Sequence, residues 1–240
     1  TEAGVPSPPT ARETSPRPFE TSRPKLTWKR DAAIYLVAIA ATMRMDDRIR
    51  TEVQEKRSPA LDRWQDHMEP LGNFGVTTTA ALGLWGGGKL AGSARTAETG
   101  RLMSESLLYA NTLNLVTRWA AGRSNPNVEN DPRGGFRSHS HHSFPSGHAT
   151  RAFVVATVLA ERYGRRAAWI AYPLATLLAV ARVESDSHWT SDVVAGAAMG
   201  QLTARWVCRH RASASTALPM VTVVPTVVRG PRSIAPGIAV

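Results

Sequence analysis

From residue 31 to residue 209 the chain consists largely of apolar segments with helical spacing, separated by short breaks that contain proline, glycine or serine. The segment 105–121 illustrates the pattern, because its large apolar residues are spaced along one helical face. These residues are Leu107, Leu108, Leu113, Leu115 and Val116. A helix with an apolar face must bury it against other elements, so the pattern predicts an all-α fold in which several helices form a bundle.

The same reasoning predicts the order of the helices. They are 34–40 with a charged continuation over 43–56, then 61–85, 105–121, 147–163, 166–183 and 191–209. Residues 70–72 interrupt the helix 61–85, and the glycines 86–88 are predicted to form a flexible turn after it. The polar segment 122–144 is long for a loop in a compact domain, and such loops often carry function.

The two ends of the chain differ from this middle part. Residues 1–30 hold six of the 16 prolines, have no periodic apolar face, and are predicted to be a linker or tether. Residues 31–212 form the predicted helical domain. In residues 213–240 valines alternate with other residues and are broken by prolines, which predicts a short, basic, extended tail.

Hydropathy and charge indicate location and partners. No segment has eighteen uninterrupted apolar residues, and the mean hydropathy of −0.22 favours a soluble protein. A bundle that lies against or partly inside a membrane remains an alternative. The sequence starts with Thr1, which a removed secretory signal would explain, so we expect a periplasmic or secreted protein, with membrane association as a further option.

The chain has 29 Lys and Arg against 19 Asp and Glu, and its formal net charge of +10 favours anionic partners. The expected partners are a phosphorylated small molecule or lipid and an anionic membrane surface. No nucleic-acid-binding motif accompanies the charge, so nucleic acid is not expected. The single cysteine, Cys208, excludes an internal disulfide. The sequence gives no prediction of the oligomeric state.

The segment Pro145-Ser146-Gly147-His148 leads a turn directly into the helix predicted at 147–163. A helix start presents unpaired N–H groups and the positive end of the helix dipole, so the amides here can bind an anion. Ser146 is the predicted N-cap, and Gly147 lets the backbone approach a phosphate closely. His148 lies in the first turn, where its imidazole could give a proton to a leaving oxygen.

About forty residues later a second segment combines Arg182, His188 and Asp192. The spacing of four residues between His188 and Asp192 lets the carboxylate reach one ring nitrogen. With the imidazole held in that tautomer, the other nitrogen is free to attack phosphorus. The planar guanidinium of Arg182 suits a phosphate clamp.

Together these segments resemble the type 2 phosphatidic acid phosphatase (PAP2) and vanadium-dependent haloperoxidase superfamily, whose signature has three parts. The second part, PSGH, is complete at 145–148. The third, SR-x5-H-x3-D, is matched at Arg182, His188 and Asp192, with Ala181 in place of the serine. The three motifs in order are a specific signal.

The first part of the signature, K-x6-RP, aligns with residues 118–126. Arg118 stands at the lysine position and keeps the charge, but Asn125 stands at the arginine position and cannot neutralise an anion. Arg123, two residues earlier, is expected to substitute for it in part.

The resemblance implies a PAP2-type helical bundle and a metal-independent phosphatase, a phosphoric ester hydrolase without a cofactor. The implied substrate is a phosphomonoester or pyrophosphate, with a lipid phosphate such as phosphatidate or a prenyl pyrophosphate favoured. His188 would be the nucleophile that forms a phosphohistidine, Asp192 its orienter and His148 the general acid. The implied phosphate ligands are Arg118, Arg123, Asn125, Ser146, Gly147 and Arg182.

Two other functions remain open. A haloperoxidase would bind vanadate in the same pocket, with His188 as its covalent ligand. A weakened phosphate- or lipid-binding protein is suggested by Asn125 and Ala181.

Other residues near the motifs have less specific interpretations. The closely spaced imidazoles of residues 138–142 are typical of metal sites, but no carboxylate or thiolate accompanies them nearby. A polar rim of the active site is therefore preferred over a metal site. Trp189, beside His188, is expected to line the pocket.

Overall fold

The structure is a computed structural model, and it describes residues 28–128 and 142–217 of the 240-residue chain. Within these ranges the chain forms seven α-helices, one short 3-10 helix (η1) and no strand. The elements are α1 (Trp28–Glu55), α2 (Pro59–Met68), η1 (Glu69–Gly72), α3 (Phe74–Leu90), α4 (Ala94–Ala121), α5 (Gly147–Tyr163), α6 (Arg165–Glu184) and α7 (Thr190–Ala217). The predicted all-α bundle is confirmed.

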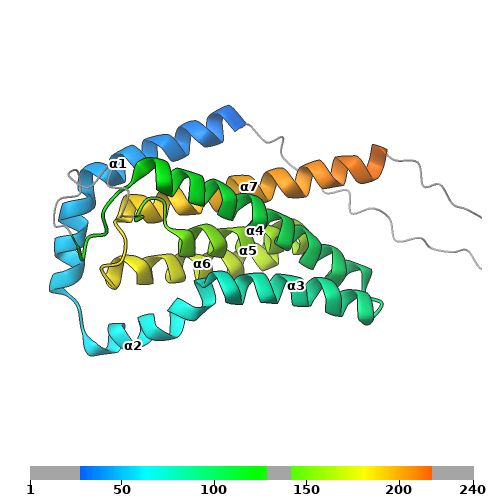
Figure 1. Ribbon diagram of the computed structural model, residues 1–240, viewed down its shortest axis with the longest axis horizontal. Coiled ribbons are helices and arrows are strands. Elements are labelled where there is room, and N and C mark those ends of the chain that lie inside the picture. Colours follow the sequence, from blue (N-terminus) through cyan, green and yellow to red (C-terminus); the bar gives the residue numbers. More distant parts are fainter. Residues whose placement is uncertain (1–27, 129–141, 218–240) are drawn as a thin grey trace, which may run out of the picture.

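Helix α5 lies at the centre of the bundle (Figure 1). It packs against α4, α6 and α7, while α3 packs against α4 and α1 packs against α7. The largest buried apolar cluster joins α3, α4, α5 and α7, and many of its side chains are small, so the helices approach closely. Its members are Ala81, Leu102, Met103, Leu107, Ala110, Val154, Val158, Ala204, Val207 and Cys208.

Two glycines of α7 determine how closely α5 approaches. A Cβ atom on Gly196 would lie 2.4 Å from the carbonyl oxygen of Ser146, and one on Gly200 would lie 2.2 Å from that of Thr150. No side chain fits at these distances, so glycine allows the two backbones to touch. The start of α5 is thereby held against the first turns of α7, which brings the PSGH segment close to the start of α7.

The predicted turn at residues 86–88 is wrong, because α3 continues through these glycines to Leu90. Here the glycines serve close helix packing, since a Cβ atom on Gly88 would lie 2.3 Å from the amide nitrogen of Ala97 in α4. The turn comes later, at Gly92, which has a φ of +67°. Ser93 then caps α4, which begins eleven residues before the predicted start at 105.

Other boundaries also differ from the prediction. The segments 34–40 and 43–56 belong to one continuous helix, α1, whereas 61–85 is divided near residues 70–72 as expected. Helix α1 begins inside the predicted linker 1–30, and α7 extends beyond residue 212 to Ala217. The rest of the linker, at 1–27, and the tail from 218 onward lie outside the described residues.

Large apolar side chains are exposed on α3, α4 and α6. Leu115 is 69% exposed, Trp169 is 74% exposed and Ile170 is 66% exposed. Helix α6 is the single helix in the described ranges that is long and apolar enough to cross a membrane. The bundle therefore carries apolar surface on several helices that its own packing does not cover.

Candidate active site

Three connecting segments meet at one end of the bundle, where the predicted motifs lie (Figure 1). They are residues 122–128 after α4, 142–146 before α5 and 185–189 between α6 and α7. Backbone hydrogen bonds join them: the amide of Ser143 donates to the carbonyl of Arg123 at 2.8 Å, and that of Ser146 donates to the carbonyl of Asp192 at 2.9 Å. Residues far apart in sequence are thus brought together in one site.

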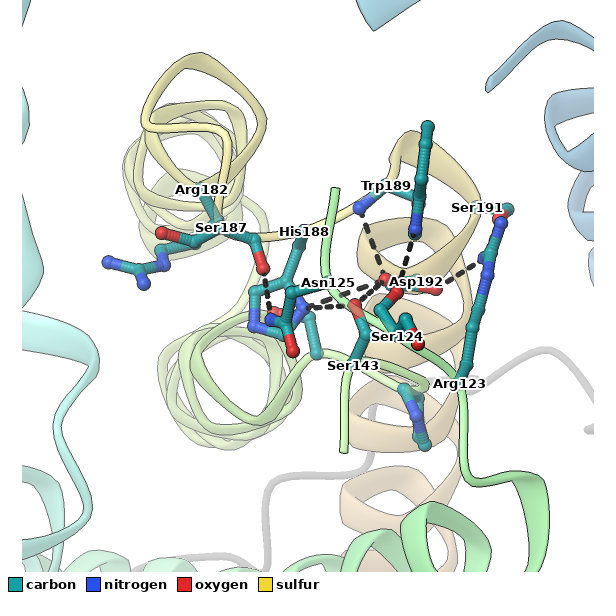
Figure 2. A network of polar contacts seen from close by, with 12 residues as sticks. Arg123, Ser124, Asn125, Ser143, Arg182, Ser187, His188, Trp189, Ser191 and Asp192 are labelled. Atoms are coloured by element: carbon teal, nitrogen blue, oxygen red, sulfur yellow. Dashed lines mark hydrogen bonds and ion pairs between the residues drawn. The ribbon is translucent and has the colours of Figure 1, made fainter. Parts of the chain in front are cut away.

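His188 is buried in the segment before α7, and its Nδ1 faces Asp192 (Figure 2). Nδ1 lies 3.6 Å from Oδ2 of Asp192 and 3.4 Å from Oγ of Ser143. The hydroxyl of Ser143 donates a short hydrogen bond to the same carboxylate oxygen. This arrangement favours a proton on Nδ1, so Nε2 is the ring nitrogen left for bond formation.

Burial lowers the pKa of His188 below the ordinary histidine value. The carboxylate of Asp192 acts in the opposite direction, and the charges of nearby arginines add to the lowering. The imidazole is therefore neutral near pH 7, which is the state in which a histidine is a nucleophile.

Arg123 lies behind His188 and is fully buried. Its Nη1 donates to Asp192 Oδ1 at 2.5 Å and to Ser191 Oγ at 2.7 Å, and its Nη2 donates to Asp46 Oδ2 at 2.8 Å. Asp46, on α1, also accepts from the backbone amide of Ser191 at 2.9 Å. The guanidinium of Arg123 therefore binds two carboxylates. The sequence had suggested Arg123 as a phosphate ligand, and the structure does not place it among those ligands.

Asn125 and Trp189 also differ from expectation in where their side chains lie. The amide of Asn125 donates to the carbonyl of Ser187 at 2.6 Å, so it anchors the segment that carries His188 (Figure 2). Trp189 is buried, with Nε1 donating to the carbonyl of Ser124 at 3.0 Å. Its ring stacks near the guanidinium of Arg123, with a distance of 5.3 Å from Cζ to the ring centroid. Trp189 supports the site from the core and is not a pocket residue.

On the other side of His188, several buried polar atoms have no hydrogen-bond partner among the described residues. They are Ser146 Oγ, His148 Nε2, Arg118 Nε and Arg182 Nε. Ser146 occupies the N-cap position of α5 as predicted, yet its side chain makes no capping hydrogen bond. Buried donors are normally satisfied, so their convergence near a helix N-terminus suits an anion with several oxygens.

His148 lies in the first turn of α5 beneath η1. A Cβ atom on Gly72 would lie 2.7 Å from Cδ2 of the imidazole, so the η1 backbone rests against the ring. Burial lowers the pKa of His148 to about 3, and the charges of Arg182 and Arg151 act in the same direction. The imidazole is therefore neutral here until a negative charge is brought close to it.

The sequence missed three residues of this site. Ser143 precedes the PSGH segment, and its place between His188 and Asp192 depends on the turn at Pro145. Asp46 lies in a charged stretch that resembles a solvated helix face. Arg151 is an isolated cation in an apolar helix. Its position four residues after Gly147, on the same helical face, is the sequence feature that could have indicated its place beside the PSGH segment.

The cluster of histidines at 138–142 is described only at its last member. His142 is exposed, and residues 138–141 lie outside the described ranges. Within those ranges no group of three or more His, Cys, Asp or Glu side chains is arranged to hold a metal ion.

Comparisons with known proteins agree with the motifs. A family model for the PAP2 superfamily matches residues 100–214. The lipid A 1-phosphatase of Porphyromonas gingivalis is 41% identical over 63 residues, which make up 25% of this chain and 14% of that protein. The matched stretch is thus a small part of that relative. The resemblance inferred from the three motifs is confirmed.

Two crystal structures share the fold. A transmembrane PAP2 type phosphatidylglycerolphosphate phosphatase from Bacillus subtilis superposes with a TM-score of 0.63 and 22% identity, over 77% of this chain and 96% of that one. LpxE from Aquifex aeolicus superposes with a TM-score of 0.57 and 21% identity, over 69% of this chain and 95% of that one. At these identities the likeness establishes the fold.

Proposed function

We propose, from the match of residues 100–214 to the PAP2 superfamily, that the protein is a metal-independent phosphatase that acts through a phosphohistidine on His188. One observation carries the proposal. A neutral imidazole with its Nδ1 toward a carboxylate lies beside a group of buried polar atoms at the start of a helix, and these atoms have no hydrogen-bond partner in the part of the chain that the structure describes. This combination supplies a nucleophile and an electrostatic site for the phosphoryl oxygens.

In the first step, Nε2 of His188 attacks phosphorus and the bond from phosphorus to the leaving oxygen breaks. His148 gives its proton to that oxygen, so the alcohol leaves neutral. The phosphate brings negative charge beside His148, which raises the pKa of the imidazole and allows it to carry the proton. Asp192 and Ser143 stabilise the positive charge that develops on His188.

In the second step, a water molecule attacks the phosphohistidine. His148, now neutral, accepts a proton from the water as the new P–O bond forms and the P–N bond breaks. Inorganic phosphate leaves, and His188 returns to its neutral state. Arg118, Arg182, Ser146 and the amide of Gly147 stabilise the phosphoryl oxygens in both steps, and no cofactor is required.

The proposed substrate is a lipid phosphate, such as phosphatidate or a prenyl pyrophosphate. An open groove of about 490 Å³ runs between α3 and α4 and is lined mainly by apolar side chains, among them Phe74, Leu82 and Leu108. Asn111, which also lines it, accepts a hydrogen bond from Arg151 near the PSGH turn. A lipid could therefore lie in the groove with its phosphate at the site.

The exposed apolar side chains of α3, α4 and α6 support membrane association of the bundle. The relative from Porphyromonas gingivalis is named a lipid A 1-phosphatase, and the one from Bacillus subtilis is described as a transmembrane phosphatidylglycerolphosphate phosphatase. We place the active-site end at the membrane surface, where the basic chain would attract anionic head groups. A periplasmic orientation is part of this proposal.

The test is phosphate release from phosphatidate in detergent micelles with EDTA present, for the unchanged protein and for His188→Ala. We expect turnover by the unchanged protein and a loss of about 10⁴-fold or more in the variant, because a missing nucleophile removes the covalent path. Equal turnover by both proteins would refute the phosphohistidine. Vanadate-dependent oxidation of bromide by added hydrogen peroxide, without phosphate release, would favour the haloperoxidase alternative.

A further inference from the structure

Arg151 is a cation that lies beside the anion site and belongs to none of the three motifs. It lies in the second turn of α5, and its side chain folds back over Gly147. A Cβ atom on Gly147 would lie 3.0 Å from Nη1 and 3.4 Å from Nη2 of Arg151. The guanidinium therefore covers the same glycine whose amide faces the proposed phosphate.

Neutral groups hold Arg151 in place. Its Nε donates to the carbonyl of Gly72 at 2.7 Å, and its Nη1 donates to Oδ1 of Asn111 at 3.4 Å. Among the described residues it has no carboxylate partner. Arg118 and Arg182 are close enough to repel it electrostatically. Arg182 has Glu69 as a partner, with 3.5 Å between Nη1 and the carboxylate oxygen, but that carboxylate is half exposed. Three cations in a partly buried site with this one exposed carboxylate favour the binding of a further anion.

The first motif supplies the reason for an extra cation. Asn125 stands where the signature has arginine, and its amide is used to hold the carbonyl of Ser187. The guanidinium of Arg123 donates hydrogen bonds to Asp46 and Asp192. Neither side chain is directed to the anion site, so the first motif contributes only the charge of Arg118.

We propose that Arg151 is a ligand of the transferred phosphoryl group and supplies from α5 the positive charge that Asn125 lacks. This inference rests on the proposed phosphatase function. The guanidinium contacts the phosphoryl oxygens beside the Gly147 amide, and its contacts with Gly72 and Asn111 fix its orientation. Arg151 thus completes a set of three arginines around the phosphoryl group, with Arg118 and Arg182.

The experiment compares Arg151→Gln and Arg151→Lys with the unchanged protein in detergent micelles. The primary measurement is binding of inorganic phosphate by titration calorimetry, which needs no turnover. The second is kcat/KM for phosphatidate and for a prenyl pyrophosphate. Arg101→Gln is the matched control, because Arg101 pairs with Glu98 and Glu105 on the surface of α4, away from the site.

Loss of a charge-assisted contact should weaken phosphate binding by about 10- to 100-fold in Arg151→Gln. Both substrates should lose kcat/KM by a similar factor, and Arg151→Lys should fall between the two proteins. Arg101→Gln should bind phosphate like the unchanged protein. If Arg151→Gln does not fold, weaker phosphate binding by folded Arg151→Lys carries the same conclusion.

Unchanged phosphate binding in a folded Arg151 variant would overturn the inference, even with a lowered melting temperature, because Arg151 would then only tie η1 to α5. A loss confined to the pyrophosphate would also overturn it, since Arg151 would contact the leaving group. Phosphate binding without turnover by the unchanged protein would refute the phosphatase function instead. The two failures are therefore distinguishable.

Discussion

Two groups of arginines lie on opposite sides of His188, and their charges are balanced in different ways. Arg123 is fully buried between Asp46 and Asp192, with hydrogen bonds to both carboxylates. Arg118, Arg151 and Arg182 form the other group. Within the described part of the chain its one carboxylate ion pair is with Glu69, which is half exposed and lies 3.5 Å from Nη1 of Arg182. A balanced cation is part of the framework, whereas an unbalanced group of cations marks a site for an external anion.

Asp192 contacts both Arg123 and the nucleophile His188, so its substitution should have the largest effect. Asp192→Asn keeps the size of the side chain but no longer favours the Nδ1 tautomer or stabilises a charged His188. We expect kcat/KM for phosphatidate to fall by about 10⁴-fold, by analogy with the aspartate of a catalytic triad. A fall of less than tenfold, with the melting temperature retained, would show that Ser143 orients the ring without Asp192.

Arg123→Met tests the balanced side of the comparison. It leaves two buried carboxylates without their cation, so we expect a loss of about 3–5 kcal/mol in the free energy of unfolding, measured by denaturant titration.

Arg182→Gln is the matched change in the group of arginines that faces the anion site. It should reduce kcat/KM by about 10²-fold with little change in stability. If Arg123→Met and Arg182→Gln lowered the free energy of unfolding equally, the two groups of arginines would not differ in their structural role.

Ser143→Ala should have a smaller effect than either. The hydroxyl bonds to Asp192 and lies near Nδ1 of His188, so its removal loosens the orientation of the ring without removing a charge. We expect a fall in kcat of about tenfold, in line with the loss of one neutral hydrogen bond of about 1–1.5 kcal/mol. Ser143→Thr, which keeps the hydroxyl, is the control and should recover part of the rate.

The smallest effect concerns pH. His188 attacks as the neutral base, and burial lowers its pKa, so the neutral form persists below the ordinary histidine value. The acid limb of kcat/KM should therefore lie below pH 6.5, and Asp192→Asn should move it lower still, because Asp192 raises the pKa. An acid limb above pH 6.5 in the unchanged protein would mean that Asp192 outweighs burial.

The fold class was predictable because helical spacing of apolar residues is a local property. The positions at which one helix ends and the next begins were less predictable. Gly86, Gly87 and Gly88 have the composition of a turn, but contact with α4 makes Gly88 a packing residue within α3. A glycine has the same local signature in both settings, and only the neighbouring helix distinguishes them.

The site was predictable in part for a similar reason. The PSGH turn and the pair His188 and Asp192 act over one or two helical turns, so their geometry follows from spacing. Trp189 was misjudged because being adjacent to His188 in sequence says nothing about which side of the chain faces the core. Asp46 contacts Ser191 across 145 residues, a separation that no local pattern encodes.

The sequence by itself determined the all-α class, the helix start that can bind an anion, and the spacing that pairs His188 with Asp192, because each depends on neighbours within a few residues. Only the tertiary structure decided which arginines are balanced by carboxylates and which face the anion site. The physical reason is that the charge balance of a buried cation depends on elements packed around it. Arg123 and Arg151 look alike in sequence, and only the packing of α1 and α7 beside one, and of α4 and η1 beside the other, separates them.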